Sequence, residues 1–244
     1  MSGHSKWSKI KHQKAVSDVK KGSLFTKLGR TVTIAAKDGG DPNFNFKLRL
    51  ALEQAKIGGV PKDTIERAIK KGTGEDKEGA ALEEILYEGF GPGGVAILIS
   101  TVTDNKNRTV SNVKHILSQH GGSLGGAGSV AWMFERKGII RFEKTAISKP
   151  MDEFELELIE AGAQDIKEED GDVEVYVLPN NLEKVKKSLE EKGIVASSAE
   201  IEFVAKDQMQ ITDPHIKANL ERMFEELDEN EDVSDFYINA TLRD

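Results

Sequence analysis

The 244-residue sequence predicts an α+β protein with an N-terminal helical bundle and two α/β domains, the third domain inserted in the second. Three observations lead to this prediction. Apolar residues recur at helical spacing between residues 23 and 72, and glycines end each stretch. From residue 138, strand and helix patterns alternate as one complete unit. A lone helix and a lone strand follow that unit and need a sheet to join.

Three helices are expected in the predicted N-terminal domain, residues 1–79. They cover about 23–37, 45–57 and 61–72, and each carries one stripe of Leu, Ile or Ala. Pro61 at the start of the third helix and a glycine at its end agree with the residue preferences of helix termini. Short loops between the helices indicate a small bundle.

The second domain begins at residue 80, where the pattern changes to strands. Two apolar runs within 85–104 are followed by a helix over 106–119 and a strand over 129–135. Residues 89–94 match the Gly-x-Gly-x-x-Gly spacing of dinucleotide-binding loops. Such a loop must open a helix, whereas this one leads into a strand. We therefore interpret 89–94 as a hairpin turn.

The segment 136–205 predicts a β-α-β-β-α-β unit, which is the ferredoxin-like order. Its elements are expected at 138–143, 151–161, 173–178, 181–192 and 194–204, with a weaker pattern that allows a short strand near 164–168. The following segment, 206–244, holds a helix after Pro214 and a strand over 235–241. We expect 206–244 to complete the domain begun in 80–135, so that the acidic unit 136–205 is an insertion.

Charge is distributed unevenly along the chain, whose formal net charge is -8. Residues 1–37 hold nine Lys or Arg and one acid, whereas residues 141–244 hold twelve bases and twenty-eight acids. The segments between them are balanced. Such asymmetry indicates a polyanionic partner for the basic end.

Several classes of protein are disfavoured by what the sequence lacks. Zero cysteines exclude disulfides, thiolate chemistry and cysteine-ligated metals. The five histidines form no converging set with carboxylates, and no hydrolase, zincin or nucleotide-binding motif is present. No apolar run reaches the roughly 18 residues that a membrane helix requires. We expect a cytoplasmic protein that is not an enzyme, with no cofactor, no metal and no membrane contact.

Two segments are candidates for binding. The first is the lysine-rich segment 5–30, in which Trp7 stands among the lysines and could stack on a base. The alternative is a solvated tail that Trp7 anchors to the bundle. The second is the glycine loop, residues 120–128, with five glycines in nine residues. It is either a flexible connector or a loop whose backbone amides contact phosphate or RNA.

Seven stretches of the sequence, in order, resemble the YebC/PmpR family, which includes the mitochondrial translational activator of cytochrome oxidase. They are GHSKWSKIKHQKA, KLGRTVTIAAKDGG, GGVPKDTIERAIKKGTGE, YEGFGPGGVAILI, TDNKNRTVSNVKHIL, HGGSLGGAGSVAWMFERKG and LDENEDV. The resemblance implies three domains, the third inserted in the second. It also implies a DNA-binding transcriptional regulator of the bacterial cytoplasm or, for other members, a factor that acts in translation at the ribosome.

Carried over to this chain, the resemblance places the nucleic-acid surface on the N-terminal domain, at Lys6, Lys9, Lys11, His12, Lys14, Lys20, Lys21, Lys27 and Arg30. Trp7 is added to these candidates because it could stack on a base. In the translational alternative the glycine loop probes RNA through Gly121, Gly122, Gly125, Gly126 and Gly128. The partner is duplex DNA or ribosomal RNA, bound by a monomer, with the ribosome as the wider assembly in the second case. A third alternative is a protein-interaction adaptor that uses the acidic rear of the chain.

Overall fold

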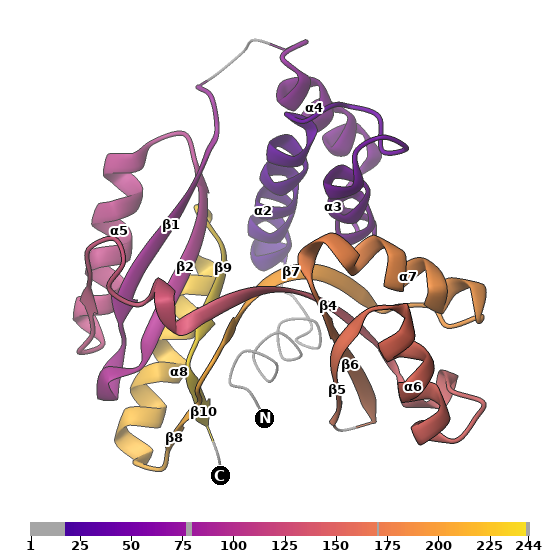
Figure 1. Ribbon diagram of the computed structural model, residues 1–244. Helices are drawn as coiled ribbons and strands as arrows, with labels where there is room; N and C mark the ends of the chain where they lie inside the picture. Colours follow the sequence, from indigo (N-terminus) through magenta and orange to yellow (C-terminus); the bar gives the residue numbers. More distant parts are fainter. Residues whose placement is uncertain (1–17, 77–79, 170, 243–244) are drawn as a thin grey trace. The chain divides into compact units, whose positions relative to one another are not determined.

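The computed structural model describes residues 18–76, 80–169 and 171–242 (Figure 1). The chain divides into two compact units: Met1–Phe134 with Ala205–Asp244, and Glu135–Val204. The predicted fold class is confirmed. An N-terminal group of helices precedes two α/β domains, and the third domain is inserted in the second.

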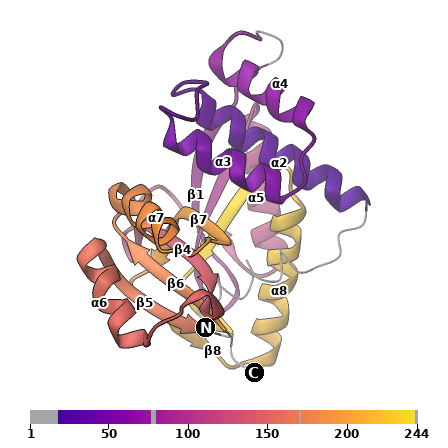
Figure 2. The same ribbon diagram turned by 90° about the vertical axis from the view of Figure 1, so that its right-hand side faces the viewer.

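The helical bundle consists of α2 (Asp18–Ala36), α3 (Phe46–Ile57) and α4 (Lys62–Thr73), seen together in Figure 2. Its core is formed by small and branched apolar residues, Val32, Ala35, Ala36, Leu48, Ala51, Ala55, Val60 and Ala68. Asn45 caps α3, because its side-chain oxygen accepts from the Leu48 amide at 3.0 Å while its Nδ2 donates to the Ala35 carbonyl at 2.7 Å. The chain is already helical at Asp18, so the expected start at Ser23 was too late.

The second domain is built on a four-stranded sheet in the order β3-β1-β2-β9. Its strands are β1 (Glu83–Phe90), β2 (Ala96–Thr103), β3 (Ser123–Leu124) and β9 (Val233–Ile238). Neighbouring strands are antiparallel, and β1 and β2 form a hairpin across the predicted turn. The helices α5 (Lys106–Gln119) and α8 (Pro214–Glu229) complete the domain.

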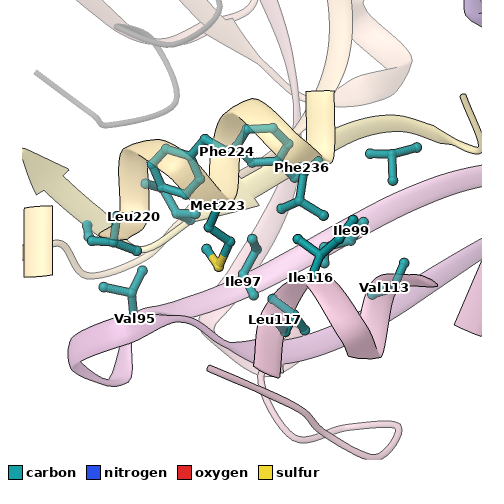
Figure 3. Packing of buried hydrophobic residues seen from close by; sticks show 14 of the residues in the cluster. Val95, Ile97, Ile99, Val113, Ile116, Leu117, Leu220, Met223, Phe224 and Phe236 are labelled. Atoms are coloured by element: carbon teal, nitrogen blue, oxygen red, sulfur yellow. The ribbon is translucent and has the colours of Figure 1, made fainter. Parts of the chain in front are cut away.

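One continuous apolar core joins these elements (Figure 3). Ile97 and Ile99 of β2 belong to it, together with Val113 and Leu117 of α5. From α8 come Leu220, Met223, Phe224 and Leu227, and the Phe224 ring stacks on Phe236 of β9 with 5.1 Å between centroids. The C-terminal segment therefore completes the core begun by residues before 120, because β2 and α5 alone would leave this apolar surface in water.

Two short strands, β3 and β8 (Met209–Ile211), were not predicted from the sequence. β8 pairs in parallel with β10 (Ala240–Leu242), which overlaps the end of the strand expected over 235–241. The expected strand over 235–241 is split at Asn239, whose side-chain oxygen accepts from the Ala96 amide at 2.8 Å. A polar side chain that satisfies a backbone amide in this way gives no hydropathy signal.

The inserted unit has the predicted β-α-β-β-α-β order, with its sheet arranged β5-β6-β4-β7. The elements are β4 (Phe134–Glu143), α6 (Met151–Ala161), β5 (Ala163–Glu169), β6 (Asp172–Val177), α7 (Leu182–Glu191) and β7 (Ser198–Ala205). Separate strands over 129–135 and 138–143 were expected, and this was wrong. Residues 131–133 form a 3-10 turn, and β4 runs unbroken from Phe134.

A buried ion cluster links three strands of the inserted unit. Arg141 on β4 donates to Glu174 on β6 at 2.9 Å and to Glu202 on β7 at 2.5 Å. Burial disfavours the charged guanidinium, but the two carboxylates outweigh that effect and raise the pKa of Arg141. Because each partner sits on a different strand, a slip of one residue in register would break the cluster.

Candidate nucleic-acid interface

The predicted cationic surface is only partly within the described residues. Six of its members, Lys6, Trp7, Lys9, Lys11, His12 and Lys14, lie outside them. Lys20 and Lys21 belong to the first turns of α2, where Lys21 is exposed. Lys27 and Arg30 lie further along the same helix, and the structure gives both a contact inside the protein.

Lys27 is directed into the protein. Its side chain is 7% exposed, and its ammonium donates to the carbonyl of Asp228, near the end of α8. The same ammonium lies 3.7 Å from the Asp228 carboxylate. A lysine held in this way cannot reach a phosphate without giving up a buried contact.

Arg30, one helical turn later, makes the stronger contact. Its Nη1 donates to Asp232 Oδ1 at 2.7 Å and to the Glu231 carbonyl at 2.8 Å. It also reaches the Val102 carbonyl at the end of β2 at 3.3 Å. We therefore assign Lys27 and Arg30 to the attachment of α2 to the second domain and leave them out of the candidate interface.

Asp232 is the centre of this attachment, and we call Arg30, Arg108, Thr109 and Asp232 the Asp232 cluster. The carboxylate also accepts from Arg108 Nη2 at 2.9 and 3.0 Å and from Thr109 Oγ1 at 2.8 Å. Burial alone would raise the pKa of Asp232, but the hydrogen bonds from Thr109, Arg30 and Arg108 outweigh burial and lower it. The acidic stretch LDENEDV, residues 227–233, thus supplies partners for basic residues of α2.

A second link lies at the end of α2. The Lys37 ammonium donates to the Leu82 carbonyl at 2.6 Å, immediately before β1. Lys27, Arg30 and Lys37, all within the described part of the chain, therefore help to hold the bundle to the second domain. The remaining candidates for phosphate contact are the six lysines before residue 22.

The glycine loop is ordered by its own packing. Gly121 has a positive φ of 81° directly after α5, and Ser123 and Leu124 pair with β1. A Cβ on Gly122 would lie 2.3 Å from the Phe90 carbonyl oxygen, so only glycine fits there. The alternative of a flexible connector does not describe this loop.

Glu88 on β1 holds the far end of the loop. Its Oε1 accepts from the Gly128 amide at 2.6 Å, and its Oε2 accepts from the Val130 and Ala131 amides at 2.8 and 2.7 Å. Burial alone would raise the pKa of this carboxyl, but the three amide hydrogen bonds lower it.

These contacts change the role expected for the loop amides. The Gly128 amide and two amides just beyond the loop, those of Val130 and Ala131, face a carboxylate of the protein itself, which takes the place that a phosphate oxygen would occupy in an anion-binding loop. The Gly125 amide is also used, because it donates to the Glu88 carbonyl at 2.8 Å. Three positions of the loop face open space, because a Cβ at Gly121, Gly126 or Gly128 would meet no atom within 4 Å.

Trp132 was not among the site residues predicted from the sequence. Its indole is 67% exposed on the 3-10 turn that follows the glycine loop. Hydropathy placed it in a strand, where an aromatic residue is expected to be buried. Neither the exposure of the indole nor the 3-10 turn that carries it can be predicted from the hydropathy pattern.

Among the described residues, no group of three His, Cys, Asp or Glu side chains is arranged to hold a metal ion. Within the same ranges, no helix combines the length and apolar character needed to cross a bilayer.

Comparison with known proteins covers both units. Residues 5–75 match the domain described as the TACO1/YebC protein N-terminal domain, and residues 82–240 match the TACO1/YebC second and third domain. A protein of Thermoanaerobacter pseudethanolicus named probable transcriptional regulatory protein is 49% identical over 245 residues, covering 100% of this chain and 98% of its own length. A protein of Moorella thermoacetica with the same descriptive name is 48% identical, covering 99% of this chain and 96% of its own length.

A solved structure is also similar. The crystal structure of a conserved hypothetical protein from Aquifex aeolicus superimposes with a TM-score of 0.85 at 39% sequence identity, covering 96% of each chain. Both domain matches and the full-length relatives lead to one conclusion. This chain belongs to the TACO1/YebC family.

Proposed function

We propose that this protein is a nucleic-acid-binding regulator, in the first instance a DNA-binding transcriptional regulator, and that its N-terminal lysines contact the phosphate backbone. The observation that carries the proposal is the concentration of nine bases and one acid in residues 1–37. Among the described residues, Lys27, Arg30 and Lys37 contact other parts of the protein, and we assign the phosphate surface to the lysines before residue 22, Lys6, Lys9, Lys11, Lys14, Lys20 and Lys21. The names of the full-length relatives agree with this function.

The anchoring of α2 supports the proposal physically. Lys27 and Arg30 fix the second half of this helix to the acidic end of the second domain. Lys20 and Lys21 precede them on the same helix, so that neutralising phosphates at these two lysines would also orient the second domain. Lysine is a mobile point charge suited to backbone contact, whereas reading a base sequence requires Arg, Asn or Gln on a recognition helix. We therefore expect binding with little sequence preference.

Salt dependence tests the proposal. If six lysines contact phosphates, the logarithm of affinity should fall with the logarithm of salt concentration at a slope of about -5 for duplex DNA and about -4 for single strands. Fluorescence anisotropy with labelled duplex DNA and with RNA of the same sequence measures both slopes. Replacing Lys6, Lys9, Lys11 and Lys14 by Glu should abolish binding and leave the thermal unfolding of the second domain and the inserted unit unchanged.

A matched control has the same change in net charge. Lys114, Lys144, Lys184 and Lys187 are exposed on the other two domains, and their replacement by Glu should leave binding nearly intact. If the N-terminal variant binds like the wild type, or if binding does not depend on salt, the proposal is wrong and the adaptor alternative gains support.

A ribosome-associated translation factor that binds ribosomal RNA is the second candidate function. It is favoured by the glycine loop, whose open positions allow close approach of a bulky partner. Sedimentation of native lysate separates the two candidates, because RNase-sensitive migration with ribosomes indicates translation and DNase-sensitive migration with DNA indicates transcription.

The loop itself is best tested at Gly126. A Cβ at Gly125 would lie 2.4 Å from Ser129 Oγ, so a change there disturbs folding, whereas Gly126 has open space. In the translational alternative Gly126→Val reduces stimulation of a reconstituted translation system and spares DNA binding. A folded Gly126→Val protein with full translational activity would remove the loop from that alternative.

A further inference from the structure

Trp132 stands out among the described side chains near the glycine loop. Its indole is 67% exposed, although the ring lies on a short 3-10 turn, Ala131–Met133, whose backbone is held on several sides. The indole Nε1 donates to the Ser129 carbonyl at 3.2 Å, so the ring lies back toward the end of the glycine loop. An exposed tryptophan leaves a large apolar area in water, which favours its use in binding.

The turn beneath the indole is unusually well supported. Glu88 accepts hydrogen bonds from the amides of Val130 and Ala131, directly before Trp132. On the other side, the Lys206 amide donates to the Met133 carbonyl at 2.9 Å, and the Lys206 ammonium donates to the Trp132 carbonyl at 2.7 Å. The backbone that carries the ring therefore has few conformations to lose when a ligand binds.

The groups around the Trp132 ring limit the kind of ligand that it can bind. Because the indole N–H is already donated to Ser129, the ring offers a ligand its π face and little hydrogen bonding. The Glu88 carboxylate, which lies on β1 beneath this turn, is buried and accepts hydrogen bonds from the Gly128, Val130 and Ala131 amides. The exposed Lys206 adds one positive charge beside the Trp132 backbone.

We propose that Trp132 stacks on an unpaired nucleobase of single-stranded RNA, with Lys206 facing the adjacent phosphate. An aromatic ring beside a cation is the arrangement by which proteins bind single strands without reading their sequence. The proposal rests on the proposed nucleic-acid-binding function and names one ligand class for a site separate from the N-terminal lysines. Since Lys206 contacts the Trp132 carbonyl and Asp207 follows it in the sequence, we expect stacking to supply most of the affinity at this site.

The test uses the full chain labelled with 5-fluorotryptophan and an oligouridylate RNA as the probe. Fluorine NMR then reports on Trp7 and Trp132, the two tryptophans of the chain, and the Trp132 resonance is assigned by its loss in Trp132→Phe. Oligouridylate should shift the Trp132 resonance, and the same RNA annealed to oligoadenylate should not, because its bases are paired.

Affinity measurements complete the test. Trp132→Ala should weaken oligouridylate binding about five- to 150-fold, the range for loss of one stacked base, without changing the salt slope. Trp132→Phe should retain most of the affinity. Phe44→Ala is the matched control, because Phe44 is an aromatic residue exposed to 91% on the helical bundle, and its loss should have no effect. Thermal melting confirms that the variants are folded.

The outcomes are distinguishable. If the wild type binds oligouridylate with the expected salt slope but neither the Trp132 resonance nor the affinity of Trp132→Ala changes, the stacking site is wrong and the proposed function stands. If Trp132→Ala weakens single strands and duplexes equally, base stacking is also excluded. If the wild type binds no nucleic acid at any salt concentration, the proposed function fails first and the stacking site fails with it.

Discussion

Arg30 and Asp232 lie 202 residues apart in the sequence, and Arg30 Nη1 donates to Asp232 Oδ1 at 2.7 Å. The pair joins the second half of α2 to the segment between α8 and β9. It also connects a basic region to the acidic end of the chain. Part of the opposite charge of the two ends is thereby used for holding the bundle in place, and not for binding a partner.

The Asp232 cluster should therefore contribute strongly to stability. Asp232→Asn leaves Arg30 and Arg108 without their shared carboxylate, and we expect a loss of about 3 kcal/mol in the free energy of unfolding because the Asp232 side chain is only 5% exposed. Urea denaturation at neutral pH measures this loss.

Asp38 provides the control for the Asp232 prediction. It pairs with Lys47 at 3.1 Å, but the two side chains are 62% and 67% exposed. Asp38→Asn should cost less than about 1 kcal/mol, since water screens an exposed ion pair. Equal losses in the two variants would mean that the Asp232 cluster does not stabilise the attachment of the bundle.

Two lowered pKa values predict a dependence of stability on pH. Asp232 and Glu88 have pKa values below their ordinary values of 3.8 and 4.5. As the pH falls, these carboxyls bind protons in the unfolded chain before they do so in the folded protein. Their contribution to the free energy of unfolding is therefore complete above the ordinary pKa values and is lost as the pH falls through the lower pKa values of the folded state. Urea denaturation between pH 7 and pH 3 should show that Glu88→Gln and Asp232→Asn lose less stability on acidification than the wild type does. Parallel pH profiles would contradict this assignment.

Two glycines of the glycine loop should respond differently to the same change. Gly122→Ala places a methyl group 2.3 Å from the Phe90 carbonyl oxygen, and we expect a loss of about 2 kcal/mol or more. Gly126→Ala meets no atom within 4 Å, and we expect a change within about 0.5 kcal/mol. Thermal melting of the two single variants compares them directly. Similar melting temperatures would show that the loop does not pack on β1 as described.

Excision of the inserted unit tests the domain boundaries. The Lys206 amide donates to the Met133 carbonyl at 2.9 Å, so the chain leaves and returns at neighbouring positions. Deleting 136–205 and joining Glu135 to Lys206 through a short Gly/Ser linker should therefore leave a soluble remainder that unfolds cooperatively. Circular dichroism during thermal melting should show a second cooperative transition for the excised unit by itself. Loss of cooperativity in both pieces would refute independent folding.

Most helices and the order of elements along the chain followed from the sequence, because hydrophobic periodicity is a local property of the chain. The three helices of the bundle and the β-α-β-β-α-β order of the inserted unit were predicted in this way. The local pattern also indicated that the last helix and strand return to the second domain, since their apolar residues must be buried against a sheet. The strand bounds near 134 and 239 were wrong because hydropathy does not register a 3-10 turn or a polar side chain that bonds a backbone amide.

The roles of individual charges were decided by the tertiary structure. In the sequence Lys27 and Arg30 are two more bases in a cationic segment, and Glu88 is one acid on a strand. Arg30 meets Asp232 from 202 positions away, and Glu88 meets the Gly128 amide from 40 positions away. Hydropathy and charge counts describe which side chains are ionic but not which partners they reach, since those partners come together only when the sheet and α8 are assembled. A charge that finds a buried partner, as Arg30 does in Asp232, becomes part of the fold.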